Sequence, residues 1–175
     1  MLEVKQIHDF LSILTLLGQL LVIFSLISFF FFYKPLRSFF VFLKSNTLLL
    51  AFIIALIATL GSLYYSEMAG FAPCNLCWLQ RIFIYPQVFI LGLAYFRKDI
   101  KIRDYSLLLA VIGLMFSLYH NYIYYTVKTT SLCSLSIPCV QKYIIGLEYV
   151  TIPLMALTAL IMIICLMILN KSDKN

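Results

Sequence analysis

Long apolar stretches alternate with short polar segments along the chain, and this alternation predicts the fold. A helix needs roughly 20 apolar residues to cross the hydrocarbon core of a bilayer. Five stretches are long enough: Phe10–Tyr33, Asn46–Tyr65, Trp78–Phe96, Tyr105–Tyr125 and about Tyr143–Leu169. Gly146 and Glu148 interrupt the last stretch, so we expect its helix to begin a few residues late. The pattern predicts an all-α integral membrane protein with five transmembrane helices.

The polar segments predict where these spans end. Residues 1–9 carry several charged side chains and predict a short exposed tail, in which His8 has no supporting neighbours and is expected to be solvated. Phe10–Tyr33 is longer than the apolar region of about 7 to 15 residues in a secretory signal and lacks a small-residue cleavage site, so we interpret it as a retained span. The other polar segments predict loops or a tail in water: 34–45, 66–73, 97–104, 126–142 and 170–175.

Composition supports the membrane interpretation. Hydrophobic residues make up 63% of the 175 residues and charged residues 11%, and the mean hydropathy is +1.02. Soluble domains are usually about 45 to 50% apolar. The chain is long enough for one small bundle of spans and leaves no room for a separate soluble domain. Its net charge of +6 does not indicate a nucleic-acid partner, because the basic residues are scattered between apolar runs instead of forming a stripe.

Lys and Arg are distributed unevenly over the two sides of the membrane. Segments 34–45 and 97–104 and the carboxyl tail hold nine of them, whereas the opposite side holds three, Lys5, Lys128 and Lys142. Cytoplasmic loops carry the excess of basic residues in membrane proteins. We therefore expect the carboxyl terminus in the cytoplasm, and loops 66–77 and 126–142 outside it.

Four of the five cysteines fall in those two outer loops. Cys74 and Cys77 form a Cys-x-x-Cys directly before the third span, and Cys133 and Cys139 precede the fifth. The outer face of a bacterial membrane is the oxidising one, so these thiols can form disulfides. Cys165 stands alone in an apolar run and is interpreted as a small buried hydrophobe.

The spacing of the four outer cysteines leaves three alternatives open. They can form permanent structural disulfides, a zinc site with four thiolate ligands, or two pairs that cycle between dithiol and disulfide. The five residues between Cys133 and Cys139 exceed the usual gap of about two to four between zinc ligands, which weakens the metal alternative. No bound metal is predicted.

Arg81 lies four residues after Cys77, on the same face of the predicted helix. The positive end of the helix dipole and this guanidinium would both stabilise Cys77 as a thiolate. A charge at the start of a span is costly without a partner and therefore suggests a functional role. An arginine here can equally extend to lipid phosphates.

The segment Cys74-Asn75-Leu76-Cys77-Trp78-Leu79-Gln80-Arg81 resembles the Cys-x-Leu-Cys-x-x-x-Arg signature of the disulfide bond formation protein B (DsbB) family, in its short BdbC-type branch. The resemblance covers roughly residues 46–169. It implies a four-helix transmembrane bundle, preceded within residues 1–45 by one additional N-terminal transmembrane helix and followed by a tail at 170–175.

The resemblance also implies a function. It indicates a bacterial cell membrane oxidoreductase that reoxidises an extracytoplasmic DsbA-like thiol oxidase of thioredoxin fold and delivers the electrons to a membrane quinone, ubiquinone or menaquinone. The rival interpretation is a structural or subunit membrane protein with two permanent outer disulfides. A transporter is disfavoured because charges within the spans are sparse.

The resemblance assigns roles to the four outer cysteines and to Arg81. Cys133 would form the mixed disulfide with the partner, and Cys139 would then attack Cys74. Cys77, released as a thiolate, would donate to the quinone. Arg81 would lie near the quinone oxygens. Apart from the resemblance, His120 lies at the outer end of the fourth span, where an imidazole can relay protons to the quinone or, in the interpretation that we favour, form an interhelical hydrogen bond. Glu148 is a candidate partner of Arg81 or His120.

Overall fold

The computed structural model describes residues 2–31, 37–99, 101–126 and 150–171. These ranges contain helices and no strand. The helices are α1 (Leu2–Phe31), α2 (Arg37–Ser45), α3 (Thr47–Leu63), a short π-helix η1 (Tyr64–Met68), α4 (Asn75–Arg97), α5 (Ile102–Thr126) and α6 (Ile152–Lys171). Five segments within them are long and apolar enough to cross a membrane: Val4–Ser25, Thr47–Met68, Asn75–Arg97, Ile102–Thr126 and Ile152–Leu169. The predicted all-α membrane fold is confirmed.

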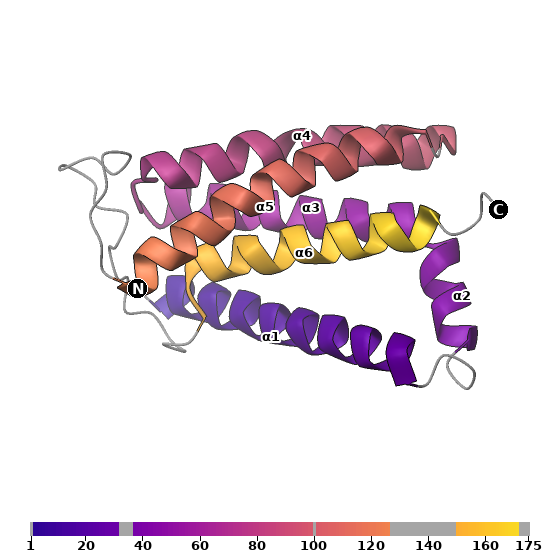
Figure 1. Cartoon of the computed structure of the whole chain (residues 1–175). Helices are drawn as coiled ribbons and strands as arrows, with labels where there is room; N and C mark the ends of the chain where they lie inside the picture. The colour runs from indigo at the N-terminus through magenta and orange to yellow at the C-terminus, as the bar shows by residue number, and fades with distance from the viewer. Residues whose placement is uncertain (1, 32–36, 100, 127–149, 172–175) are drawn as a thin grey trace.

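Helices α3, α4, α5 and α6 form a bundle in which each packs on the next and α6 closes against α3 (Figure 1). Its core combines small and branched side chains: Ala51, Ala55, Ile84, Leu91, Ala110, Leu160, Ile163, Leu166 and Met167. Gly113 shows why small residues matter here, because a Cβ at this position would lie 2.9 Å from Cβ of Phe83 on α4. Close backbone approach of this kind is typical of helix packing in lipid.

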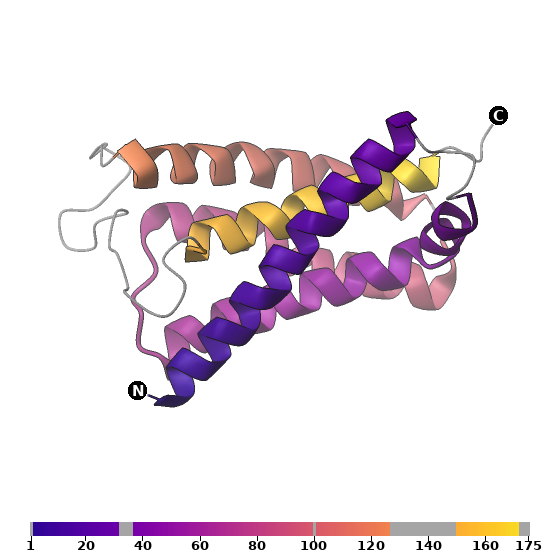
Figure 2. The same ribbon diagram turned by 90° about the horizontal axis from the view of Figure 1, so that it is seen from below.

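Helix α1 lies outside this bundle and runs diagonally across α3 and α6 (Figure 2). Gln19 Nε2 donates a hydrogen bond to Thr158 Oγ1 of α6 at 3.1 Å. Gly18 leaves room for Met162, since a Cβ at Gly18 would lie 2.8 Å from the Met162 sulfur. The additional N-terminal helix therefore packs against the four-helix bundle. Helix α2 lies across the end of the bundle, near the carboxyl terminus of α6 (Figure 1).

The two ends of the bundle differ in chemistry. One end holds the last residues of η1 and α5 and the first residues of α4, which follows its cap residue Cys74. We call this end of the bundle the cysteine end. The opposite end carries the α4–α5 connection with exposed basic residues, Arg97, Lys98 and Lys101, and we call it the basic end. Both ends of the bundle consist of the polar segments that separate the apolar spans in the sequence.

Five predicted boundaries were wrong. The π-helix η1 continues to Met68 and α5 begins at Ile102, both within segments predicted as loops. Residues 2–9 are helical, and His8 is only 4% exposed because it packs on Tyr65. Segment 34–45 contains α2 from Arg37 onward. Helix α4 begins at Asn75, three residues before the predicted span, because Cys74 caps it.

The last span begins late, as predicted, but α6 starts nine residues after Tyr143 and not a few. Helix α6 begins at Ile152, and the hydroxyl of Thr151 accepts a hydrogen bond from the amide of Leu154 at 3.3 Å. Glu148 lies outside the described residues, as do positions 172–175 of the tail.

Candidate functional site

Cys74 is the N-cap residue of α4. Its backbone is extended (φ −72°, ψ 169°), and its sulfur accepts a hydrogen bond from the amide of Cys77 at 3.3 Å. The amides of a first helical turn have no partner within the helix, so a cap sulfur can accept from one of them. The Cys-x-x-Cys spacing thereby brings the two free thiols together, with 2.8 Å between their sulfurs. Only a small side-chain movement separates this dithiol from a disulfide.

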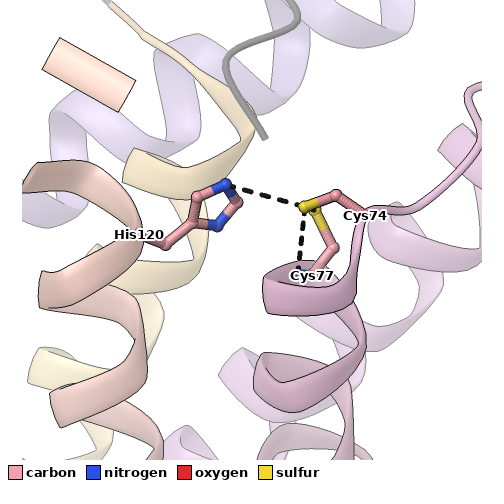
Figure 3. Close-up of side chains that lie close together, drawn as sticks. All are labelled: Cys74, Cys77 and His120. Carbon is pink, nitrogen blue, oxygen red and sulfur yellow. Dashed lines mark hydrogen bonds between the residues drawn. The ribbon is translucent and has the colours of Figure 1, made fainter. Parts of the chain in front are cut away.

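His120 extends from α5 toward this pair (Figure 3). Its Nε2 lies 3.8 Å from the sulfur of Cys74, and its Nδ1 lies 3.2 Å from Nε2 of Gln80 on α4. An amide nitrogen only donates, so the Gln80 contact makes Nδ1 the acceptor and leaves the proton on Nε2. The histidine therefore donates to Cys74. Its side chain is 1% exposed, which keeps this contact away from water.

The hydrogen bonds converge on Cys74. The thiol of Cys77, the imidazole of His120 and the amide of Cys77 all donate to its sulfur, and they lower the pKa of Cys74 to about 4 against the opposing effect of burial. From the helix dipole and the position of Arg81, we predicted that Cys77 would carry the negative charge. The structure instead directs the donors at Cys74, because the cap position, and not the first turn, faces the free helix amides.

Arg81 points into the protein. Its Nε donates to Oγ of Ser62 and its Nη2 to the carbonyl oxygen of Ser62, both at 2.9 Å. The guanidinium carbon lies 5.3 Å from the ring of Trp78, and the residue is 9% exposed. Tyr85 also donates to Ser62 Oγ, at 3.2 Å. The alternative in which Arg81 extends to lipid phosphates is therefore wrong.

A cavity of about 850 Å³ adjoins these groups. At the cysteine end its lining includes Cys74, Cys77, Gln80, Arg81 and His120. Further along, its walls are mainly apolar side chains of α1, α3 and α6: Leu14, Leu17, Leu21, Leu50, Ile53, Ile54, Ile57 and Met162. A cavity with hydrogen-bond donors at one end and apolar walls along the rest suits a molecule with a compact polar head and an apolar tail.

The same side chains can hold a metal ion. The two sulfurs and a ring nitrogen of His120 all lie within 4.8 Å of one another. Two thiolates and an imidazole are ligands that zinc accepts. A disulfide between Cys74 and Cys77 would remove two of these ligands, so metal binding and disulfide formation exclude each other.

The other predicted site residues cannot be placed with this cluster. Cys133, Cys139 and Glu148 lie outside the described residues, so the second pair, the four-thiolate alternative and the partners proposed for Glu148 stay predictions. Cys165 is on α6, is half-buried and does not line the cavity.

Sequence reasoning missed three residues that position the site. Ser62 anchors Arg81, Gln80 orients His120, and Tyr65 holds His8. Gln80 carried a signal, because a polar side chain inside an apolar span seeks a buried partner. Ser62 and Tyr65 carried none, since a serine and a tyrosine near the end of a span are common.

Comparison with known proteins identifies the family. The family described as "Disulfide bond formation protein DsbB" matches residues 44–169. The chain belongs to the DsbB family. Its members are thiol–disulfide oxidoreductases of the membrane, which agrees with the dithiol at the cysteine end of the bundle.

Named relatives place the chain near the short branch of the DsbB family. It is 44% identical to disulfide bond formation protein C of Bacillus subtilis over 130 residues, which cover 71% of this chain and 92% of that protein. It is 48% identical to probable disulfide formation protein C 1 of Bacillus anthracis over 120 residues, covering 66% and 86%. No solved structure matches the chain. The family match begins after α1, so this helix lies outside it.

Proposed function

We propose that this DsbB-family protein takes electrons from an extracytoplasmic DsbA-like thiol oxidase and passes them through two cysteine pairs to a membrane quinone. The observation that carries the proposal is the position of Cys74 and Cys77, at the polar end of a cavity whose walls are otherwise apolar. A quinone has a polar head and an isoprenoid tail, and the lining residues fit that division. The uneven distribution of Lys and Arg supports an extracytoplasmic cysteine end and a cytoplasmic carboxyl terminus.

Disulfide exchange accounts for the route to Cys74. A thiolate of the partner attacks Cys133 and breaks the Cys133–Cys139 disulfide. The Cys139 thiolate then attacks Cys74 and breaks the Cys74–Cys77 disulfide, which releases Cys77. After resolution by the partner's second thiol and by Cys133, the partner is oxidised and Cys74 and Cys77 are reduced. Two electrons and two protons have then moved from the partner to this pair.

The residues around the pair prepare it for reoxidation. His120 and the amide of Cys77 stabilise negative charge on Cys74. Arg81 presents a guanidinium to the cavity and is held there by Ser62, so it is positioned to bind an oxygen that gains negative charge. The quinone, when bound, accepts the two electrons and two protons. Ubiquinone and menaquinone both have the required head and tail.

Thiol trapping tests this function. The full chain in membranes is reduced with dithiothreitol, freed of reductant, and incubated with a short-chain quinone before alkylation. We expect both disulfides to return in the wild type and to stay absent in Cys77→Ser, a loss of at least about a thousandfold in rate because the electron path is broken. Cys165→Ser is the matched control and should behave as the wild type.

The rival interpretation makes the opposite forecast. Permanent structural disulfides would resist mild reduction or would re-form at the same rate with and without quinone. Either result would overturn the proposed function.

A further inference from the structure

Helix α1 forms part of the cavity although it lies outside the part of the chain that matches the DsbB family. Its lining residues are His8, Leu11, Leu14, Thr15, Leu17, Gly18 and Leu21. The helix is held against both neighbouring helices. Gly18 and Gln19 contact α6, and Leu11 contacts α3, where a Cβ at Gly61 would lie 3.3 Å from Leu11 Cδ1. The cavity of this protein is therefore completed by an element that the matched region does not supply.

His8 is the ionisable side chain that α1 contributes to this lining. It is 4% exposed, and its Nδ1 lies 2.8 Å from the hydroxyl of Tyr65. Its other ring nitrogen, Nε2, is buried and has no hydrogen-bond partner within the described ranges. A buried polar atom without a partner is costly, and such atoms in native structures call for an explanation.

The contact with Tyr65 determines what Nε2 can do. The single hydroxyl proton can serve Nδ1 at 2.8 Å or the sulfur of Met155 at 4.0 Å. Thioether sulfur is a weak acceptor, so the shorter contact prevails and Tyr65 donates to Nδ1. The proton of the neutral ring then resides on Nε2. His8, one of the lining residues, therefore carries a buried N–H donor that no described group accepts.

We propose that His8 is a quinone-binding residue, which donates a hydrogen bond from Nε2 to a carbonyl oxygen of the quinone head. The inference rests on the proposed function. A quinone ring carries two carbonyl oxygens on opposite sides, and the cavity offers cationic or N–H donors from two separate elements, Arg81 of α4 and His8 of α1. The additional helix thus supplies an acceptor-specific contact as well as an apolar wall.

Equilibrium binding measures this contact without turnover. The full chain carrying Cys77→Ser is titrated with a short-chain ubiquinone, and quenching of Trp78 fluorescence reports occupancy. Trp78 is the sole tryptophan, and its ring lies 5.3 Å from the guanidinium carbon of Arg81, so the fluorescence change comes from one position next to the cavity lining. In this background His8→Ala should weaken binding about fivefold, the effect of one lost hydrogen bond. His8→Gln, which keeps an N–H donor, should stay within about twofold, and the exposed control Gln6→Ala should cause no change.

Tyr65→Phe separates binding from docking of α1. It removes the contact that holds His8 but keeps the imidazole on α1, so its effect should be smaller than that of His8→Ala. Equal weakening by Tyr65→Phe, His8→Ala and His8→Gln would mean that His8 only seats the helix, and would overturn the proposal. Unchanged binding in His8→Ala would overturn it too, while leaving the proposed function intact. Absence of quenching in the parent protein would overturn both.

Discussion

Two pairs of polar side chains connect α4 and α5, and the two pairs have different roles. Gln80 meets His120 near the cysteine end, and Gln87 meets Ser106 near the basic end. The two glutamines are seven residues apart and so lie on one face of α4. All four side chains are buried.

In the pair near the basic end, Gln87 and Ser106 each donate a hydrogen bond to the other residue. Gln87 Nε2 donates to the carbonyl oxygen of Ser106 at 2.9 Å, and the hydroxyl of Ser106 donates to Gln87 Oε1 at 2.6 Å. Neither residue lines the cavity. In the pair near the cysteine end, Gln80 occupies only one nitrogen of His120, and the other is directed at Cys74. The Gln87–Ser106 pair, in which each residue donates to the other, therefore only holds the two helices together. The Gln80–His120 pair also leaves one donor of His120 directed at the thiol of Cys74, so it can affect the chemistry of the site.

Arg81 offers the largest expected change at the cysteine end. If its guanidinium binds a quinone oxygen, Arg81→Ala should raise the KM for quinone about ten- to a hundredfold, because hydrogen bonds to charged groups contribute about 1.5–3 kcal/mol. Steady-state quinone reduction measures this. The KM of Arg81→Lys should lie between those of the wild type and Arg81→Ala, since lysine keeps the positive charge but lacks the planar guanidinium group. Arg97→Ala, an exposed arginine at the other end of α4, is the control; unchanged quinone kinetics in Arg81→Ala would remove Arg81 from the site.

Replacing His120 is expected to change the pKa of Cys74, and this effect is smaller than that of replacing Arg81. Loss of its donated hydrogen bond in His120→Ala should raise the pKa of Cys74 from about 4 by about one to two pH units. Thiolate absorbance near 240 nm of the reduced protein, followed from pH 3 to 9, measures it, with Cys74→Ser to assign the signal. The lowered pKa also means that the thiolate stabilises the reduced fold fully above the ordinary thiol pKa of about 8.5, and that this stabilisation is lost as the pH falls toward 4. An unshifted titration in His120→Ala would contradict the contact.

Gln87 should show the smallest effect, and on stability alone. Gln87→Leu removes two interhelical hydrogen bonds and should lower the free energy of unfolding by about 1–2 kcal/mol, since such bonds contribute modestly in lipid. Titration with a denaturing detergent, followed by circular dichroism, measures this change. Quinone kinetics should stay as in the wild type. A large loss of activity in a folded Gln87→Leu protein would erase the distinction between the two pairs.

Much of this arrangement is predictable from the chain alone. The five spans follow from apolar length, and the motif places Cys74, Cys77 and Arg81 on one stretch of helix, where spacing fixes their relation. The contacts of His120 with Cys74 and of Arg81 with Ser62 join residues 46 and 19 positions apart. Such contacts depend on how whole helices are rotated against each other, which apolar periodicity does not determine when a helix is hydrophobic on nearly every face.

His8 illustrates the same limit in its strongest form. A charged amino-terminal segment predicts solvation, yet the residue is buried through its contact with Tyr65, 57 positions away. Local composition carries no information about that partner. The position of Cys74 as cap, in contrast, was within reach of local reasoning, since a residue just before a helix faces its free amides.

The hydrogen bond between Gln19 and Thr158 also limits when α1 can reach its final position. The two residues are 139 positions apart, so α1 leaves the ribosome before α6. At about 5 to 20 residues per second, on the order of ten seconds pass before α6 is made. During that interval the Gln19 amide and the groove at Gly18 lack their α6 partners within the bilayer. The contacts of α1 with α6 can therefore form only late in synthesis, well after α1 itself has been made.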